Sequence, residues 1–279
     1  MHDKIKPKSH IELVRYLDKY AANLHRLPIA NVDRRTVAKF LDGVAEEHGK
    51  IAMNRCRSAL SNCFVWAMKK GRVESNPIIG TEVHEENERD RWLRDDELRA
   101  VWNALGEDDY SNIIRLLILT GQRRGEIADL RWSEVDFECA VIALPPERTK
   151  NEQRHEVPMS SVVRDILLTQ PKTGERVFAP VVSWHRSREL IAKKAGFANW
   201  TLHDLRRSVS TGMGEIGILP HAIEAVLNHG SGFRSGVGGT YNRSPYFAEK
   251  KQALSLWADH VAAVVEGRES NVTSISGRS

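Results

Sequence analysis

Six residues whose chemistry suits attack on a phosphodiester occur in a fixed order along this 279-residue chain. Cleavage without a metal ion needs fixed positive donors for the phosphate oxygens, a nucleophile, and a proton for the departing oxygen. The six residues are Arg123, Lys150, His203, Arg206, His229 and Tyr241. Two guanidiniums, an ammonium, two imidazoles and a phenol can supply each of these parts. Their combination predicts a protein that cuts and rejoins DNA.

Arginine suits the phosphate because its planar guanidinium donates paired hydrogen bonds to anionic oxygens. Arg123 follows Gly121 at the end of an apolar run, where one helix is expected to stop and the next to begin. The free N-terminus of a helix attracts anions. The sequence alone does not choose between Arg123 and Arg124. Glu126, three residues beyond Arg123, could orient its guanidinium and is expected to support the site.

His203 and Arg206 are three positions apart, so on a helix they share a face and can address one phosphate. Arg207, four positions after His203, competes for the same role. The adjacent His203 and Asp204 also resemble part of a metal-dependent phosphohydrolase site, but no convincing set of further metal ligands accompanies them. We therefore expect no metal ion and no other cofactor.

Lys150 lies in a polar connection between two expected strands, from which a long ammonium side chain can reach into a groove. His229 ends an expected helix before a glycine-rich segment. Tyr241 follows that segment, a position that fits a mobile nucleophile. Tyr246 is the rival phenol, but Pro245 directly before it should stiffen the backbone. These positions favour Tyr241 as the nucleophile.

Helical periodicity dominates residues 1–75, where apolar residues recur at helical spacing. Residues 1–73 hold 15 Lys or Arg against 7 Asp or Glu, a charge of +8, whereas the whole chain carries +4 and the remainder therefore −4. A basic front end is expected of a module that grips the DNA backbone. Four basic residues of the third expected helix are predicted to bind phosphate: Arg55, Arg57, Lys69 and Lys70.

A charged stretch at 76–92 contains Pro77 and breaks the periodicity, so it is predicted to be a linker. Helical segments resume at 93–265, interrupted by apolar clusters on either side of RTKNEQR that predict strands. The polar residues 266–279 are expected to be disordered. The predicted fold class is mainly α with a small β-sheet (α+β), with a helical DNA-binding domain at 1–75 and a catalytic domain at 93–265.

Membrane and secretory roles find no support in the sequence. The longest apolar run, 113–119, is interrupted by Arg115 and is far too short to span a bilayer. No apolar stretch of signal-peptide length follows the basic N-terminus. The three cysteines lack metal-site or disulfide-framework spacing. We expect a cytoplasmic bacterial protein associated with the nucleoid.

Several motifs resemble those of the tyrosine recombinase (phage integrase) family. TGQRRGEI is similar to the family's first-arginine motif, TKNEQRHEVPMS to its β-hairpin lysine motif, and LHDLRRS to its His-x-x-Arg box. LNHG is similar to the second-histidine motif. GGTYNRSPYFAEKKQALSLWADHV resembles the nucleophile region of P4-like prophage integrases in particular. The likeness covers nearly all of residues 1–265.

The resemblance implies a helical core-binding (SAM-like) domain followed by a tyrosine-recombinase catalytic domain with the DNA breaking-rejoining fold. It implies a site-specific recombinase, or integrase, that needs neither metal nor ATP. Arg123 and Arg206 would stabilise the pentavalent phosphate, and Lys150 would protonate the leaving 5′-oxygen. Glu126 matches a position that supports the catalytic site.

The remaining roles follow from the same resemblance. His203 would assist proton transfer, His229 would hydrogen-bond the phosphate, and Tyr241 would form a 3′-phosphotyrosyl bond. The implied partners are double-stranded DNA with core attachment sites and three further copies of the chain. In the implied homotetramer on two duplexes, the helix after Tyr241 docks on a neighbouring protomer.

Two features depart from the family's pattern. Asn228 stands where glycine is usual. P4-like integrases usually begin with an additional arm-binding domain, which this chain is expected to lack because Met1 directly precedes the core-binding helices. Two other functions compete with recombination. A type IB topoisomerase uses a similar tyrosine, but the C-terminal likeness argues against it. The intact catalytic positions argue against a degenerate, non-catalytic prophage DNA-binding protein.

Overall fold

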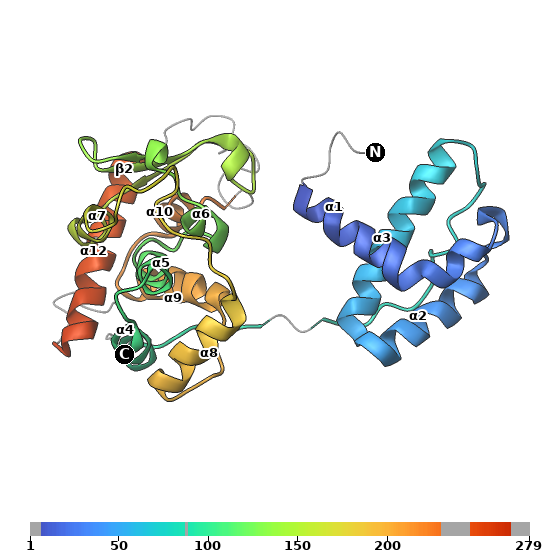
Figure 1. Cartoon of the computed structure of the whole chain (residues 1–279), viewed down its shortest axis with the longest axis horizontal. Helices are drawn as coiled ribbons and strands as arrows, with labels where there is room; N and C mark the ends of the chain where they lie inside the picture. Colours follow the sequence, from blue (N-terminus) through green and yellow to red (C-terminus); the bar gives the residue numbers. More distant parts are fainter. Residues whose placement is uncertain (1–6, 87–88, 230–245, 269–279) are drawn as a thin grey trace. The chain divides into compact units, whose positions relative to one another are not determined.

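The computed structural model describes residues 7–86, 89–229 and 246–268. The chain divides into two compact units, Met1–Arg89 and Asp90–Ser279, and each is described by itself (Figure 1). Within the described part of the chain, no helix has both the length and the apolar character needed to cross a membrane. The prediction of a mainly helical chain with a small sheet is confirmed.

The first unit contains helices and connecting turns and no strand in its described residues. Asp33 caps α2 by accepting a hydrogen bond from the Thr36 amide at 2.8 Å. Gly49 has φ 86°, a value that glycine adopts without strain, and it separates α2 from α3. The elements are α1 (Pro7–Val14), η2 (Arg15–Tyr20), η3 (Ala21–Arg26), η4 (Ile29–Asn31), α2 (Arg34–His48) and α3 (Lys50–Lys69). Their buried core includes Val37, Leu41, Met53, Leu60 and Phe64.

Residues 76–86 pack on α3, although they begin the stretch expected to be a linker. Ile78 is 1% exposed and belongs to the core of the first unit. The Asn54 side chain donates to the His84 carbonyl at 2.7 Å and accepts from the His84 amide at 3.1 Å. The charges of this stretch suggested a solvated segment, but its backbone polar groups are held by a buried amide.

The second unit combines helices with one sheet. The helical segments predicted within 93–265 are present, interrupted by the strands of the sheet. The elements are α4 (Asp95–Ala104), α5 (Asp109–Thr120), α6 (Arg124–Ala128), η5 (Trp132–Glu134), β1 (Val135–Asp136), β2 (Val141–Leu144), η6 (Pro146–Arg148), β3 (His155–Pro158), α7 (Ser161–Leu168), α8 (Trp184–Ala195), α9 (Leu202–Glu215), α10 (Pro220–Leu227) and α12 (Phe247–Glu266).

The sheet is antiparallel in the order β1-β2-β3. Ile142 pairs with Val157, and Leu144 pairs with His155. The connection between β2 and β3 holds η6 and then the turn that carries Lys150. The prediction that apolar strands flank a polar connection here is therefore confirmed.

Helix α5 runs through the middle of the second unit (Figure 1). Nine of its residues are buried, so almost its whole surface packs against other elements. Arg115 interrupts the apolar run, but its guanidinium donates to the Gly106 carbonyl at 2.8 Å and to Asn112 at 2.9 Å. These two hydrogen bonds and a partly exposed side chain accommodate the charge beside the core.

Helix α12 packs against α4, α5, α9, α10 and β3 of its own chain. Trp257 is 1% exposed, and its indole nitrogen donates to the Ile118 carbonyl at 2.8 Å. A Cβ atom on Gly212 of α9 would lie 2.5 Å from the Trp257 ring, so only glycine allows this approach. The chain thus buries the apolar face of α12 within its own core. The expected docking of this helix on a neighbouring protomer stays a prediction.

Candidate active site

The turn between α5 and α6 sets the position of Arg123. Gly121 ends α5 with φ 64°, and a Cβ atom there would lie 2.8 Å from Leu227 and 2.9 Å from Val209. Glycine is therefore required by both the backbone and the packing. The buried Gln122 side chain donates to the Val226 carbonyl at 2.9 Å, which ties the turn to the end of α10.

Arg123 begins α6 and is held by a buried carboxylate. Glu126 is 3% exposed; it accepts from the Arg123 amide at 3.0 Å and from its guanidinium at 3.1 Å. The other guanidinium nitrogen donates to the Asn228 carbonyl at 3.2 Å. Arg124 instead lies over the Trp184 ring at 4.9 Å. Of the two neighbouring arginines, the geometry favours Arg123 as the one that binds a phosphate.

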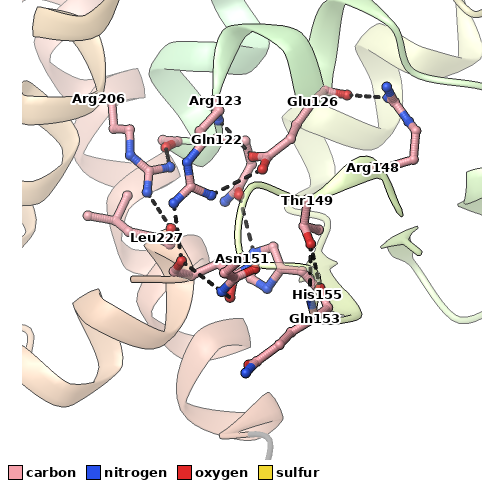
Figure 2. Close-up of polar contacts among 12 residues, drawn as sticks. Gln122, Arg123, Glu126, Arg148, Thr149, Asn151, Gln153, His155, Arg206 and Leu227 are labelled. Atoms are coloured by element: carbon pink, nitrogen blue, oxygen red, sulfur yellow. Dashed lines mark hydrogen bonds and ion pairs between the residues drawn. The ribbon is translucent and has the colours of Figure 1, made fainter. Parts of the chain in front are cut away.

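Arg206 is 5% exposed and connects the ends of two helices. Its guanidinium donates to the Gly121 carbonyl at 2.7 Å and to the Leu227 carbonyl. Burial, together with the nearby Arg123 charge, lowers the pKa of Arg206 to about 10. Figure 2 shows the Arg206 and Arg123 guanidiniums pointing toward the same end of α10. Arg207 forms an ion pair with Asp204 at 3.1 Å on its own helix.

His203 lies one helical turn before Arg206 on α9. Its side chain is exposed, but partial desolvation of the ring lowers its pKa, and the charges of Arg207, Arg206 and Arg123 lower it further. The imidazole is therefore held in its neutral form at neutral pH. A neutral imidazole beside two guanidiniums can accept a proton from an attacking hydroxyl.

The turn that carries Lys150 is anchored on both sides. The Arg148 guanidinium donates to Glu134 at 2.8 Å and to the Glu126 carbonyl at 3.0 Å. The Thr149 hydroxyl donates to the Gln153 carbonyl at 2.8 Å, which closes the turn. Lys150 itself is exposed. Its ammonium group can thus extend from a fixed turn, of which Figure 2 shows the Thr149–Gln153 contact.

Asn151 and Asn228 join this turn to the end of α10, and sequence reasoning missed the pair. Asn151 donates to the Asn228 side-chain oxygen at 2.8 Å, and the Asn228 amide donates back at 3.2 Å. Asn228 adopts the left-handed conformation, with φ 49° and ψ 48°. This conformation explains why glycine is usual there and why asparagine is tolerated. An asparagine at a helix end was the available signal.

His229 follows directly, and its Nδ1 lies 3.0 Å from a Glu224 carboxylate oxygen. Its side chain is about one-third exposed. A carboxylate on Nδ1 favours the tautomer that carries the proton there and orients the ring. Glu224 was not predicted from the sequence, although it lies five residues before His229.

His155 lies beneath the site, 4% exposed. Its Nε2 lies 3.2 Å from the Gln122 side-chain oxygen and 3.1 Å from the Val226 carbonyl. Burial, with a smaller contribution from the Lys250 charge, lowers the pKa of His155 to about 3. A neutral His155 therefore supports the turn before Arg123 without adding charge.

Tyr241 lies outside the described residues. The rival phenol, Tyr246, lies just before α12 with φ 48°, and its ring centroid is 5.6 Å from that of His221. His221 is near the start of α10, whereas His229 follows its end. Since a helix rises about 1.5 Å per residue, these two ends are roughly 10 Å apart. Tyr246 therefore packs at the far end of α10 from Arg123.

The basic residues predicted on α3 differ in their surroundings. Arg55 pairs with Glu86 at 2.9 Å, and Arg57 donates to the Thr81 hydroxyl at 2.9 Å. Both guanidiniums thus contact the 76–86 segment rather than pointing only to solvent. Lys69 and Lys70 are exposed at the opposite end of α3.

Taken together, the second unit gathers five of the six predicted catalytic residues around the end of α10. Arg123 and Arg206 bind carbonyls of its last residues, His229 follows it, and the Lys150 turn is joined to it through Asn151. His203 lies within electrostatic range of both arginines. This arrangement can bind a phosphate, transfer a proton to or from it, and stabilise negative charge that develops on it.

Comparisons with known proteins show the family of the chain. A family model described as the phage integrase family matches residues 91–234. Prophage integrase IntA of Escherichia coli (strain K12) is 27% identical over 259 residues, covering 86% of this chain and 62% of that protein. The integrase of Shigella phage Sf6 is 27% identical over 240 residues, covering 80% of this chain and 61% of that protein. The chain spans about three fifths of the length of these curated relatives.

Solved structures share the fold. A lambda integrase dimer bound to a COC′ core site has a TM-score of 0.66 at 18% identity, covering 81% of this chain and 89% of that one. The Tn1549 transposon integrase in complex with circular intermediate DNA has a TM-score of 0.65 at 16% identity, covering 90% and 94%. A lambda integrase tetramer bound to a Holliday junction has a TM-score of 0.64 at 19% identity, covering 81% and 73%.

Proposed function

The chain belongs to the phage integrase family, and we propose that it is a site-specific DNA recombinase that cleaves and rejoins strands through a covalent 3′-phosphotyrosyl intermediate. The observation that carries this proposal is the convergence of Arg123 and Arg206 at the end of α10. Two guanidiniums from distant parts of the chain donate to the carbonyls of the adjacent residues Leu227 and Asn228, and burial together with the Arg123 charge lowers the pKa of Arg206. Such a concentration of positive charge is favourable when an anion such as a phosphodiester binds between the two groups.

In the proposed reaction, the Tyr241 oxygen attacks phosphorus and forms a new P–O bond as the bond to the 5′-oxygen breaks. The bonding electron pair leaves with the 5′-oxygen, which takes a proton from the Lys150 ammonium. The phenol proton passes to His203, whose lowered pKa keeps it neutral and able to accept. Rejoining is the reverse, with a 5′-hydroxyl as nucleophile. The phosphodiester energy is conserved in the tyrosyl ester, so the scheme needs no ATP.

Arg123 and Arg206 bind the non-bridging oxygens and stabilise the charge of the pentavalent transition state. His229 hydrogen-bonds the phosphate through Nε2 as an imidazolium, which donates from both ring nitrogens, while Glu224 accepts from its Nδ1. Glu126 supports this arrangement by holding Arg123.

Double-stranded DNA is the proposed partner. The solved relatives include complexes with a core site and with a Holliday junction. We propose a homotetramer on two duplexes, with a core-binding domain at 1–75, a connection at 76–92 and a catalytic domain at 93–265. The excess positive charge of residues 1–73 supports backbone binding by the first of these domains.

Trapping of the covalent adduct tests the proposal. A core-site duplex carrying a nick beside the scissile phosphate releases a short oligonucleotide on cleavage, so the adduct accumulates. We expect the unmodified chain and Tyr246→Phe to form the adduct and Tyr241→Phe to form none. An adduct in Tyr241→Phe would show that another residue is the nucleophile. If the unmodified chain forms no adduct on any candidate core site in the DNA that flanks its gene, the proposed activity is contradicted.

A further inference from the structure

The Asn151–Asn228 amide pair connects two parts of the site that no helix or strand joins. The residues are 77 positions apart, yet each side chain donates to the other, at 2.8 and 3.2 Å. Asn228 is 5% exposed, so its amide is shielded from water. A buried amide that lost its partner would keep unpaired polar atoms, which makes the pairing specific.

The backbone of Asn228 contributes as well. Its carbonyl accepts from the Arg123 guanidinium at 3.2 Å and lies 3.4 Å from the Asn151 amide nitrogen. One residue therefore contacts Arg123 through its main chain and the Lys150 turn through its side chain. Glycine could adopt the same left-handed backbone and keep both carbonyl contacts, but it would lack the side-chain pair with Asn151.

Lys150 immediately precedes Asn151 in the turn. The Thr149–Gln153 contact closes the base of this turn, but it does not direct the tip toward Arg123. The amide pair orients the tip, because Asn151 is bound to Asn228, and Asn228 contacts Arg123 through its carbonyl and directly precedes His229. The position of the Lys150 backbone relative to the two guanidiniums thus depends on Asn151 and Asn228, in addition to the anchor that Arg148 makes on the Glu126 carbonyl.

We propose that Asn151 and Asn228 are positioning residues that hold Lys150 where its ammonium can protonate the leaving 5′-oxygen. This inference rests on the proposed function, and it assigns the pair to one step of strand cleavage, the protonation of the leaving oxygen. Proton donation is worth about 10²–10⁴-fold in rate, and a displacement of about 1 Å can cost roughly 10²-fold. Loss of the pair should therefore slow strand cleavage by about 10- to 100-fold.

The test uses two nicked substrates, one with the natural 5′-bridging oxygen and one with sulfur in its place. A thiolate leaves without being protonated, so the sulfur substrate does not need Lys150. The variants are Asn228→Gly, which keeps the left-handed backbone, Asn151→Ala, and the two combined. Asn103→Ala, at an exposed position on α4, is the matched control. Single-turnover rates of adduct formation are measured with saturating protein.

We expect Asn228→Gly and Asn151→Ala to slow cleavage of the oxygen substrate and to cleave the sulfur substrate at nearly the unmodified rate. The combined variant should be no slower than the slower single variant, because both changes remove one interaction. Arg206→Ala should be slow on both substrates.

Three outcomes would overturn the inference. Unchanged rates on the oxygen substrate would show that the pair does not position Lys150. Equal slowing on both substrates would assign the pair to Arg123 or to the fold instead. Absence of an adduct in the unmodified chain with both substrates would contradict the proposed function, and the inference would fall with it.

Discussion

Replacing Gly212 by alanine should destabilise the second unit, whereas the same change at Gly214 should not. The new methyl group at Gly212 would lie 2.5 and 2.6 Å from two carbons of the Trp257 ring, where about 3.5–4 Å is comfortable. At Gly214 the nearest atom is Ile223 Cδ1, at 4.0 Å. Both glycines lie in α9, so the two substitutions share the same gain in helix propensity.

That gain is at most about 1 kcal/mol for alanine over glycine. Overpacking at Gly212 opposes it by about 1–3 kcal/mol, and displacement of the Trp257 indole from the Ile118 carbonyl costs about 1 kcal/mol more. We therefore expect Gly212→Ala to lower the free energy of unfolding by about 1–3 kcal/mol. Gly214→Ala should leave it unchanged or raise it by up to about 1 kcal/mol.

Urea unfolding followed by tryptophan fluorescence measures these changes. Six of the seven tryptophans lie after residue 89, so the signal reports mainly on the second unit. The change in free energy follows from the shift in midpoint and the slope of the transition. If both variants had the same stability, the close approach of α12 to α9 would not be the constraint described above.

Three further predictions concern single side chains. Glu126→Gln keeps the size of the side chain but removes the charge that pairs with Arg123. The rate of adduct formation should fall about tenfold or more, because a hydrogen bond to a charged group is worth about 1.5–3 kcal/mol. The pKa of His155 in the folded chain is lowered to about 3, so the unfolded chain binds a proton at this residue below about pH 6.5 and the folded chain does not. The free energy of unfolding should therefore fall by up to about 1.4 kcal/mol per pH unit as the pH drops from 6.5 toward 3. In His155→Gln, urea unfolding should show a free energy that changes less between pH 6.5 and 5. Lys69→Ala should reduce the salt slope of DNA binding by about one. Asn103→Ala, at an exposed position of the second unit, removes no charge and should leave that slope unchanged.

Much of the fold followed from periodicity. The helices around α2, α3, α5 and α9 have apolar residues at helical spacing and recognisable ends, such as Asp33 and Gly121. The hairpin followed from two apolar clusters around a polar connection. Helix spacing, helix ends and the hairpin depend on residues that are close in the sequence, so they can be predicted from the sequence alone.

Long-range contacts between polar side chains could not be predicted in this way. Nothing near Asn54 indicates that its amide holds His84, and nothing near Asn151 points to Asn228. The roles of the six predicted catalytic residues remain predictions. The choice of Arg123 over Arg124, however, now has a geometric reason, because Arg124 stacks on Trp184.

The partners of Arg206 have an electrostatic consequence. Gly121 and Leu227 lie at the C-terminal ends of α5 and α10, and each such end carries roughly half a negative elementary charge from aligned peptide dipoles. Two helices thus direct negative ends toward the proposed phosphate site, and Arg206 donates to both. An isosteric but neutral side chain at this position would do more than remove one contact. It would expose the approaching phosphate to two repulsive dipoles.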